Sequence, residues 1–332
     1  MGVAGLVFIL LLVEWVYGSL YLGVKRVRGL GNFSENVALI PPPKEGRFRF
    51  AAIGDPKEGQ TIYQHLMSMA YDQGASFVVC NGDLVDRATP ESFELFNHGY
   101  QSLGQKALPT FSALGNHDDS PLRLFQEYYG PESFAFLYGG SLFIFADNNS
   151  PESLEGCASY VRDQIHLHGN EAKHVFIVLH KPITDHEKDE RIVRNRHRSG
   201  YMYDILDSEK VDAVLTGHFH GYAREEYNGK LLLVTGGAGA RLHDARAFYH
   251  MVLIDVGPDG IKDTVVRLDE VYPFTDRLRV EAVVNYPLFF GSWWRPLLLL
   301  LVGGGFVFAG LKPARKPTGR ERAVRATVGE GV

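Results

Sequence analysis

The stretch Ser-Phe-Val-Val-Cys-Asn-Gly-Asp-Leu-Val-Asp, residues 76–86, joins an apolar run to a polar cluster with two carboxylates. Residues 76–80 have the composition of a buried strand, because β-branched and aromatic side chains favour strands. Gly82 lets the backbone turn sharply after that strand and brings Asp83 to its carboxyl end. The stretch therefore predicts a buried strand that ends in acidic side chains.

Polar side chains follow an apolar run at four further places, namely Gly54-Asp55, Gly115-Asn116-His117-Asp118, His180 and Gly217-His218-Phe219-His220. In an α/β sheet the carboxyl ends of the strands converge on one edge, where ligands bind. Carboxylate and amide oxygens suit hard divalent ions, and neutral imidazoles suit Mn, Fe or Zn. In an extended segment His218 and His220 lie on the same face, since side chains alternate. Together the five clusters predict one cleft that binds divalent metal.

Short apolar runs alternate with amphipathic stretches through the middle of the chain. The predicted strands are residues 48–53, 76–80, 109–113, 134–138, 142–146, 174–179, 211–215, 231–234, 248–256 and 261–268. The predicted helices are residues 59–73, 91–104, 121–129, 152–167 and 200–208. Strands alternating with helices, followed by strand-rich sequence, predict an α/β sandwich with helices outside.

The composition is that of a chain with a substantial core. Of 332 residues 45% are apolar and 22% are charged, with a formal net charge of -5. This mildly acidic balance gives no electrostatic reason to expect nucleic acid as a partner. Cys80 and Cys157 are the only cysteines, too few for a disulfide framework or a cysteine-based zinc site.

Both ends of the chain are apolar. Residues 1–24 are long enough to span a bilayer, but Val16-Tyr17-Gly18 resembles a signal-peptidase site. Either a cleaved signal peptide or an N-terminal membrane anchor is therefore expected. Residues 288–311 contain an apolar run preceded by Trp293, Trp294 and Arg295, side chains that suit the membrane interface, and they predict a transmembrane helix.

Basic residues near these ends set the expected orientation in the membrane. The tail, residues 312–332, carries six Lys and Arg residues and outnumbers the cluster Lys25, Arg26 and Arg28. The positive-inside rule then places the tail in the cytoplasm and the main domain outside it. The smaller cluster favours the cytoplasmic face if the N-terminal segment is retained. Residues 25–46, with three consecutive prolines, predict an extended linker, and residues 273–287 a connector.

Taken in chain order, the clusters resemble the motifs of the calcineurin-like metallophosphoesterase family, which are DxH, GDxxD, GNHD or GNHE, H and GHxH. The matching residues are Asp55, GDLVD at 82–86, GNHD at 115–118, His180 and GHFH at 217–220. The resemblance spans roughly residues 48 to 270 and predicts a phosphoesterase domain over residues 47–272. It implies a two-layered β-sandwich flanked by helices, with two divalent ions of Mn, Fe or Zn.

The resemblance also implies a role for each matching residue. Asp83 would bridge the two ions, Asp55 and His220 would complete the first site, and Asn116, His180 and His218 would complete the second. His117 would protonate the leaving oxygen or steady the phosphoryl group, with Asn116 also touching the substrate. Asp118 would hold the His117 imidazole in the right tautomer, and Asp86 would support the loop.

The implied activity is hydrolysis of a phosphomonoester or phosphodiester by a hydroxide that two metal ions activate. The substrate would then be a phosphate ester. An alternative from another class is a membrane-tethered metal-binding or regulatory module that has lost turnover.

The first motif departs from the family pattern, because Asp55-Pro56-Lys57 has Lys57 where the family has a His ligand. An ammonium close to a divalent ion is repelled by it. Three arrangements follow: Lys57 turns outward to bind the substrate phosphate, Gln60 or a water fills the vacancy, or the first site is weak. We expect the first arrangement, with a water in the vacant position. The departure is also the main support for the alternative without turnover.

Overall fold

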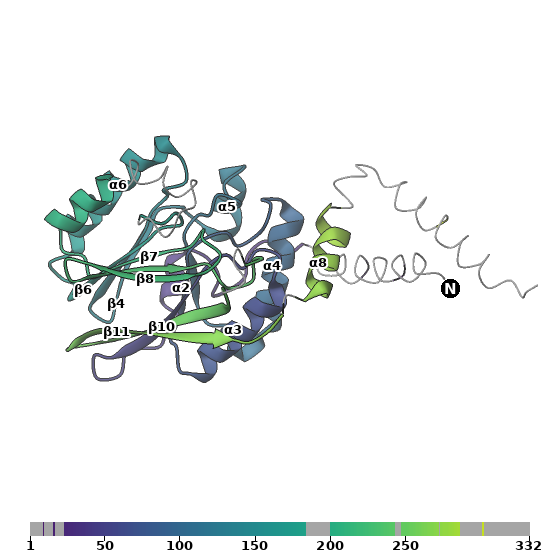
Figure 1. Ribbon diagram of the computed structural model, residues 1–332, viewed down its shortest axis with the longest axis horizontal. Helices are drawn as coiled ribbons and strands as arrows, with labels where there is room; N and C mark the ends of the chain where they lie inside the picture. Colours follow the sequence, from purple (N-terminus) through teal and green to yellow (C-terminus); the bar gives the residue numbers. More distant parts are fainter. Residues whose placement is uncertain are drawn as a thin grey trace, which may run out of the picture.

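The computed structural model describes residues 23–183, 200–242, 247–271 and 273–285, with the single positions 9, 16 and 301. Its strands form two stacked sheets (Figure 1). One sheet has the order β11 (Gly260–Leu268), β10 (Tyr249–Gly257), β1 (Phe48–Ile53), β2 (Val78–Cys80) and β3 (Thr110–Ser112). The other has the order β4 (Phe134–Tyr138), β5 (Ser141–Phe145), β6 (His174–Val178), β7 (Ala213–Thr216), β9 (Lys230–Thr235) and β8 (Tyr222–Tyr227).

The central strands of each sheet are parallel. β1, β2 and β3 run in one direction in the five-stranded sheet, and β5, β6, β7 and β9 do so in the six-stranded sheet. β10, β11, β4 and β8 are antiparallel to their neighbours. The parallel strands of each sheet therefore end at a common edge, which is where the polar clusters begin.

Aromatic rings fill the space between the sheets. Alternate residues of each strand point to opposite faces, so Phe50 and Ala52 lie between the sheets while Ala51 and Ile53 face the outer helices. The rings of Phe50 and Phe143, from different sheets, lie 5.2 Å apart in an edge-to-face arrangement. Such pairs add to the stability that comes from burying the rings.

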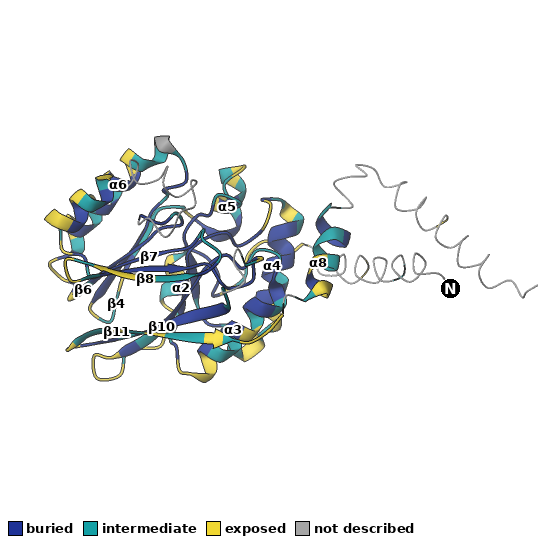
Figure 2. Cartoon of the chain, viewed as in Figure 1, coloured by how far each residue is buried: buried dark blue, intermediate teal, exposed yellow. Residues whose placement is uncertain are grey.

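Helices cover the outer face of both sheets, as the sequence predicted. α3 (Gln60–Asp72), α4 (Pro90–Ser102) and α5 (Leu122–Tyr129) pack on the five-stranded sheet. α6 (Pro151–His168) and the helical residues 200–208 pack on the six-stranded sheet. Figure 2 shows the central strands between these layers as buried, and exposed residues on the outer surfaces of α3 and α6. The fold is the two-layered sandwich flanked by helices.

The segment predicted as a linker, residues 25–46, is instead docked on the domain and contains a short helix, α2 (Ser34–Val37). The Asn32 amide donates to the carbonyl oxygen of Ser112 at 2.7 Å, and its Oδ1 accepts the Ser112 N–H at 2.9 Å. These bonds satisfy the backbone of β3 at the edge of its sheet. The start of the segment also contacts α4, since Gly23 N–H donates to Glu94 at 2.7 Å.

The predicted connector is also folded, as α8 (Phe274–Val280) and a π-helical turn, η2 (Glu281–Asn285), beside α4 (Figure 1). Asp276 is buried and accepts both the N–H and the hydroxyl of Thr61, at 2.7 and 2.8 Å. Val283 and Val284 pack against Leu95 of α4. Residues 273–285 are therefore part of the folded domain.

The apolar runs at residues 1–24 and 288–311 lie outside the described residues, except for positions 9, 16, 23, 24 and 301, and the basic tail lies wholly outside them. Among the helices that the structure describes, none combines the length and the hydropathy needed to cross a bilayer.

Candidate metal centre

The polar clusters meet where strands of the two sheets end. Asp55 and Asp83 directly follow β1 and β2, and His180 and His218 follow β6 and β7. Backbone hydrogen bonds hold these loops together, from Asp55 N–H to Gly82 at 3.0 Å and from Gly217 N–H to His180 at 2.9 Å. Residues from distant parts of the sequence thus share one site.

Several loop residues at the site have a strained backbone. Asp55, Lys57, Asp83 and His218 have φ values of 57°, 43°, 55° and 66°, in the left-handed region that residues other than glycine seldom adopt. Such conformations cost on the order of 1–3 kcal/mol each and persist only where the surroundings impose them. Strain concentrated at these residues is typical of a functional site.

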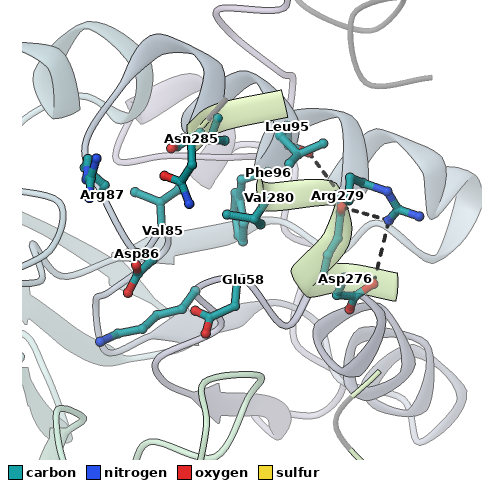
Figure 3. Close-up of a pocket in the computed structure, with 14 residues that line it drawn as sticks. Glu58, Val85, Asp86, Arg87, Leu95, Phe96, Asp276, Arg279, Val280 and Asn285 are labelled. Carbon is teal, nitrogen blue, oxygen red and sulfur yellow. Dashed lines mark hydrogen bonds and ion pairs between the residues drawn. The ribbon is translucent and has the colours of Figure 1, made fainter. Parts of the chain in front are cut away.

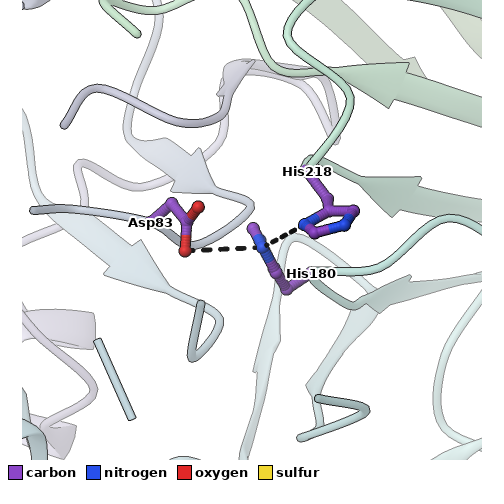
Figure 4. Close-up of side chains that lie close together, drawn as sticks. All are labelled: Asp83, His180 and His218. Atoms are coloured by element: carbon purple, nitrogen blue, oxygen red, sulfur yellow. Dashed lines mark hydrogen bonds and ion pairs between the residues drawn. The ribbon is translucent and has the colours of Figure 1, made fainter. Parts of the chain in front are cut away.

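Three side chains, those of Asp83, Asn116 and His218, converge on the Nε2 atom of His180, and we call these four residues the His180 group. Figure 4 shows Asp83, His180 and His218. The buried ring directs Nδ1 at the carbonyl oxygen of Asn81, at 2.8 Å, so Nδ1 carries a proton, and in the neutral ring Nε2 presents its lone pair to the other three side chains. Nε2 lies 2.9 Å from Asn116 Oδ1, 3.4 Å from Asp83 Oδ1 and 3.2 Å from His218 Nδ1.

These contacts bring the His180 nitrogen against two oxygen acceptors. Facing lone pairs repel each other unless a cation lies between them. The spacing suits atoms that each lie about 2.0–2.2 Å from a common ion. The donor set of the His180 group therefore fits a divalent metal.

A second set, which we call the Asp55 group, consists of Asp55, Asp83 and His220, with one ligand atom of each within 4.8 Å of the others. His220 donates from Nδ1 to the carbonyl oxygen of Arg241 at 2.8 Å, and its Nε2 lies 3.5 Å from Asp55 Oδ1. Asp55 Oδ1 is buried without a hydrogen bond from the described residues. The two groups share Asp83, and its role as a bridge between two ions stays a prediction.

Lys57 turns inward rather than outward. Its Nζ lies 3.1 Å from Asp83 Oδ2, and its side chain is only 8% exposed. This differs from the arrangement expected from the sequence, in which Lys57 faced the substrate. Gln60 does not replace it as a ligand, because its Nε2 donates to the carbonyl oxygen of Leu95 at 3.0 Å and its Oε1 faces Arg279 at 3.5 Å.

Burial and charge shift the pKa values of the candidate ligands. Burial, and then Asp83, raise the pKa of Asp55 to about 8. Burial also acts to raise the pKa of Asp83, but the neighbouring His180 and Lys57 bring it well below its usual range. Burial, and then His180, lower the pKa of His218 to about 3. Burial, and then Lys57, lower the pKa of His220. The rings of His218 and His220 are thus kept neutral, the form that binds metal.

His117 lies at the edge of the site, with its ring against Asp86. Its Nδ1 is 2.7 Å from the Asp86 carbonyl oxygen and 3.6 Å from the Asp86 carboxylate. Its backbone N–H donates to Asp83 Oδ1 at 2.9 Å. The ring is therefore oriented by Asp86, and not by Asp118 as the sequence suggested.

Asp118 has a different position, buried between two ligand loops. Its carboxylate accepts three backbone N–H groups at 3.1 Å, from Leu84, Val85 and Gly115. With both oxygens directed at these donors, Asp118 ties the GDLVD loop to the GNHD loop.

The sequence analysis missed one polar cluster that supports the site. Asp147-Asn148-Asn149 follows β5, and Asn148 Oδ1 accepts the backbone N–H of His180 at 3.2 Å and of Lys181 at 3.0 Å. The signal was present, since these polar residues follow an apolar run in the same manner as the other clusters. Asn148 fixes the backbone that carries His180.

A cleft of about 490 Å³, including its opening to solvent, borders the centre (Figure 3). One wall contains Glu58, Asp86 and Arg87 from the ligand loops, and the other contains Phe96 of α4 and Val280 of α8. Lys57 also lines this cleft. Its mixture of charged and apolar side chains suits the organic part of a substrate.

His250 on β10 is a buried histidine outside both groups. Its Nδ1 lies 2.9 Å from the carbonyl oxygen of Phe248, and its Nε2 lies 3.0 Å from the Thr235 hydroxyl. Burial lowers the pKa of His250 from 6.5 to about 4. This ring is part of the packing between β9 and β10.

We expect acid to destabilise the wild type more than His250→Gln. Between pH 6.5 and 4 the unfolded chain takes up a proton at this ring that the folded chain does not, so the free energy of unfolding falls as the pH drops. The difference in pKa corresponds to about 3 kcal/mol. Urea unfolding of both proteins from pH 7.5 to pH 4 measures it. Parallel pH curves for the two proteins would contradict the expectation.

Residues 48–222 match the calcineurin-like phosphoesterase family. No curated protein matches the chain by sequence. Solved structures with a similar fold include GAP50, described as the anchor in the inner membrane complex of Plasmodium, at 15% identity and a TM-score of 0.50, covering 72% of this chain and 95% of that chain.

Two phosphatases are also among the similar structures. The purple acid phosphatase PPD1 from yellow lupin (Lupinus luteus) has 13% identity and a TM-score of 0.50, over 68% of this chain and 52% of its own. A dimetal phosphatase from Danio rerio has 12% identity and a TM-score of 0.50, over 68% of this chain and 99% of its own. At these identities the likeness concerns the fold alone.

Proposed function

The chain belongs to the calcineurin-like phosphoesterase family, and from this premise we propose that it hydrolyses a phosphate ester, either a monoester or a diester, at a divalent-metal centre. The observation that carries the proposal is the convergence of Asp83, Asn116 and His218 on the Nε2 atom of His180. Asp83 and Asn116 present oxygen acceptors to that nitrogen, and a divalent cation would join them to the neutral ring.

The two groups divide the ligands between two candidate positions. Asp83, Asn116, His180 and His218 would hold one ion, and Asp55, Asp83 and His220 are the candidate ligands of a second. Mn, Fe and Zn suit imidazole nitrogens together with carboxylate and amide oxygens. When bound, such ions supply Lewis-acid polarisation of the phosphoryl oxygens and activate a water molecule.

Side chains at the edge of the site would handle the substrate. His117 directs Nδ1 at the Asp86 carbonyl oxygen, so its Nε2 is available to the substrate. From that position Nε2 would donate a proton to the leaving oxygen, and the Asp86 carboxylate lies 3.6 Å from Nδ1 of the same ring. The Asn116 amide nitrogen would donate to a phosphoryl oxygen, while Lys57 adds positive charge beside Asp83. The neighbouring cleft would receive the leaving group.

We expect the purified chain, loaded with Mn²⁺, to hydrolyse p-nitrophenyl phosphate or bis(p-nitrophenyl) phosphate, and to lose that activity in EDTA. Release of nitrophenol measures both. His180→Ala should abolish activity, because it removes the nitrogen on which the ligands converge. His166→Ala, on the exposed surface of α6, is the matched control and should retain it. Hydrolysis of neither ester with Mn²⁺, Zn²⁺ or Fe²⁺ would refute the proposed function.

A second candidate is the tethered metal-binding or regulatory module without turnover. The inward Lys57, which occupies an oxygen of Asp83, is the observation that favours it. Binding of metal without hydrolysis of either ester would support this candidate over the enzyme.

We further propose that the apolar runs at residues 1–24 and 288–311 hold the chain at a membrane, with the domain outside the cytoplasm. The similar structure GAP50 is described as an anchor in a membrane complex, which agrees with this placement. A phosphate ester at the membrane surface would then be within reach of the site.

A further inference from the structure

We propose that Lys57 supplies the cation of the Asp55 group, so that each chain binds one divalent ion, on the His180 group, rather than two. This inference rests on the proposed metal centre. It adds how many ions the centre binds and what the Lys57 ammonium contributes to it.

The position of the ammonium carries the inference. Lys57 Nζ lies 3.1 Å from Asp83 Oδ2, the oxygen that Asp83 does not direct at His180. Both side chains are almost wholly buried, at 8% and 1% exposure, so solvent does little to screen the pair. The oxygen that a second ion would use already has a positive partner.

A second ion on the same oxygen would lie very close to that ammonium. With a metal–oxygen distance of about 2.1 Å, the ion would be no more than about 5 Å from Nζ. A divalent ion and an ammonium at that distance repel each other strongly in a buried site. The Asp55 group can thus hold either Lys57 or a second ion, and the chain itself supplies Lys57.

The loop that carries Lys57 is fixed in this position. Lys57 N–H donates to the Asp83 backbone carbonyl at 3.1 Å, and Gly59 N–H donates to the Pro56 carbonyl at 2.9 Å. Lys57 also has a φ of 43°, in the left-handed region. The backbone therefore sets the side chain beside Asp83 and keeps it within reach of the carboxylate.

The charges of the two groups agree with this assignment. The groups contain two carboxylates, Asp55 and Asp83, besides neutral rings and an amide. One divalent ion together with Lys57 exceeds the two carboxylates by one positive charge even when both are ionised, which leaves a site that attracts a phosphate group. Two divalent ions and Lys57 would leave three uncompensated positive charges in a buried site, which is costly.

The test is the metal content of the full-length chain, loaded with Mn²⁺, freed of unbound metal and measured by inductively coupled plasma mass spectrometry. We expect one ion per wild-type chain. Lys57→Met, which removes the charge, and Lys57→His, which adds a ligand, should both raise the content toward two. Electron paramagnetic resonance should show coupled Mn²⁺ ions in the variants and an uncoupled ion in the wild type.

A second substitution locates the single ion. His220→Ala removes a ligand of the Asp55 group only, so the wild-type content of one should persist. The same substitution in Lys57→His should return the content from two to one. His218→Ala should remove the ion from the wild type, since His218 belongs to the His180 group.

The outcomes separate this inference from the proposed function. Two ions per wild-type chain, one ion in both Lys57 variants, or loss of the single ion in His220→Ala would each overturn the role of Lys57. The metal centre itself would stand in those cases. A wild-type chain without any metal would instead overturn the centre on which the proposed function depends.

Discussion

Asp83→Asn is expected to strip the metal from the chain and to lower ester hydrolysis by at least about 10³-fold, since metal polarisation of a phosphoryl group contributes several kcal/mol to the transition state. Asp83 is the one residue that both groups share. Its Oδ1 lies 3.4 Å from His180 Nε2, and its Oδ2 lies 3.1 Å from Lys57 Nζ. The amide would remove the negative charge from both positions at once.

Metal content and initial rates with bis(p-nitrophenyl) phosphate measure the effect. Asp72→Asn is the matched control, because Asp72 forms a surface ion pair with Lys106 and belongs to neither group of candidate ligands. It should retain both metal and activity. An Asp83→Asn protein that keeps its metal and most of its rate would show that the ion is held elsewhere.

Asp118→Ala should lower the free energy of unfolding by about 3 kcal/mol or more, because three buried N–H groups would lose their acceptor. The loss would also release the GDLVD loop from the GNHD loop and weaken metal binding. Unfolding in urea with EDTA present isolates the change in stability from the loss of metal.

Asp86→Ala is the comparison variant for Asp118→Ala. The Asp86 side chain is 56% exposed and faces the His117 ring, so its removal should change stability by less than about 1 kcal/mol. It should instead lower kcat, because the carboxylate lies 3.6 Å from Nδ1 of the His117 ring, which would donate a proton to the leaving oxygen. The reverse result, a destabilised Asp86→Ala and a fully stable Asp118→Ala, would reinstate the roles first expected from the sequence.

The sequence was sufficient for the buried strands and insufficient for exposed elements. Residues 48–53, a central strand, were predicted with their observed bounds, because an apolar run between turns is a strong signal. β8, Tyr-Ala-Arg-Glu-Glu-Tyr, was missed, since it forms the edge of its sheet and carries charged side chains typical of edge strands. α8 was missed because its seven residues are too few for a helical period to stand out.

At the site, side-chain ligands could be inferred, but their orientation could not. The order of carboxylates, Asn and His along the chain predicted which side chains would meet, and the structure brings them together; their roles as ligands stay predictions. The backbone carbonyl oxygens of Asn81 and Arg241 orient His180 and His220. Because every residue has such a carbonyl, the sequence does not indicate which one a histidine ring will contact. The direction of Lys57 likewise depends on backbone torsions that spacing does not reveal.

Both ends of the described domain attach to the same helix. Asn97 of α4 donates to the carbonyl oxygens of Val24 and Lys25, and Val283 and Val284 of η2 pack against Leu95, also on α4. If both apolar runs are held in a bilayer, the two segments that join them to the domain both contact α4. Two attachments on one helix would also restrict tumbling and keep the side that bears the cleft turned toward the lipid. The position of α4 would then determine how the edge that carries the candidate site is oriented toward the membrane.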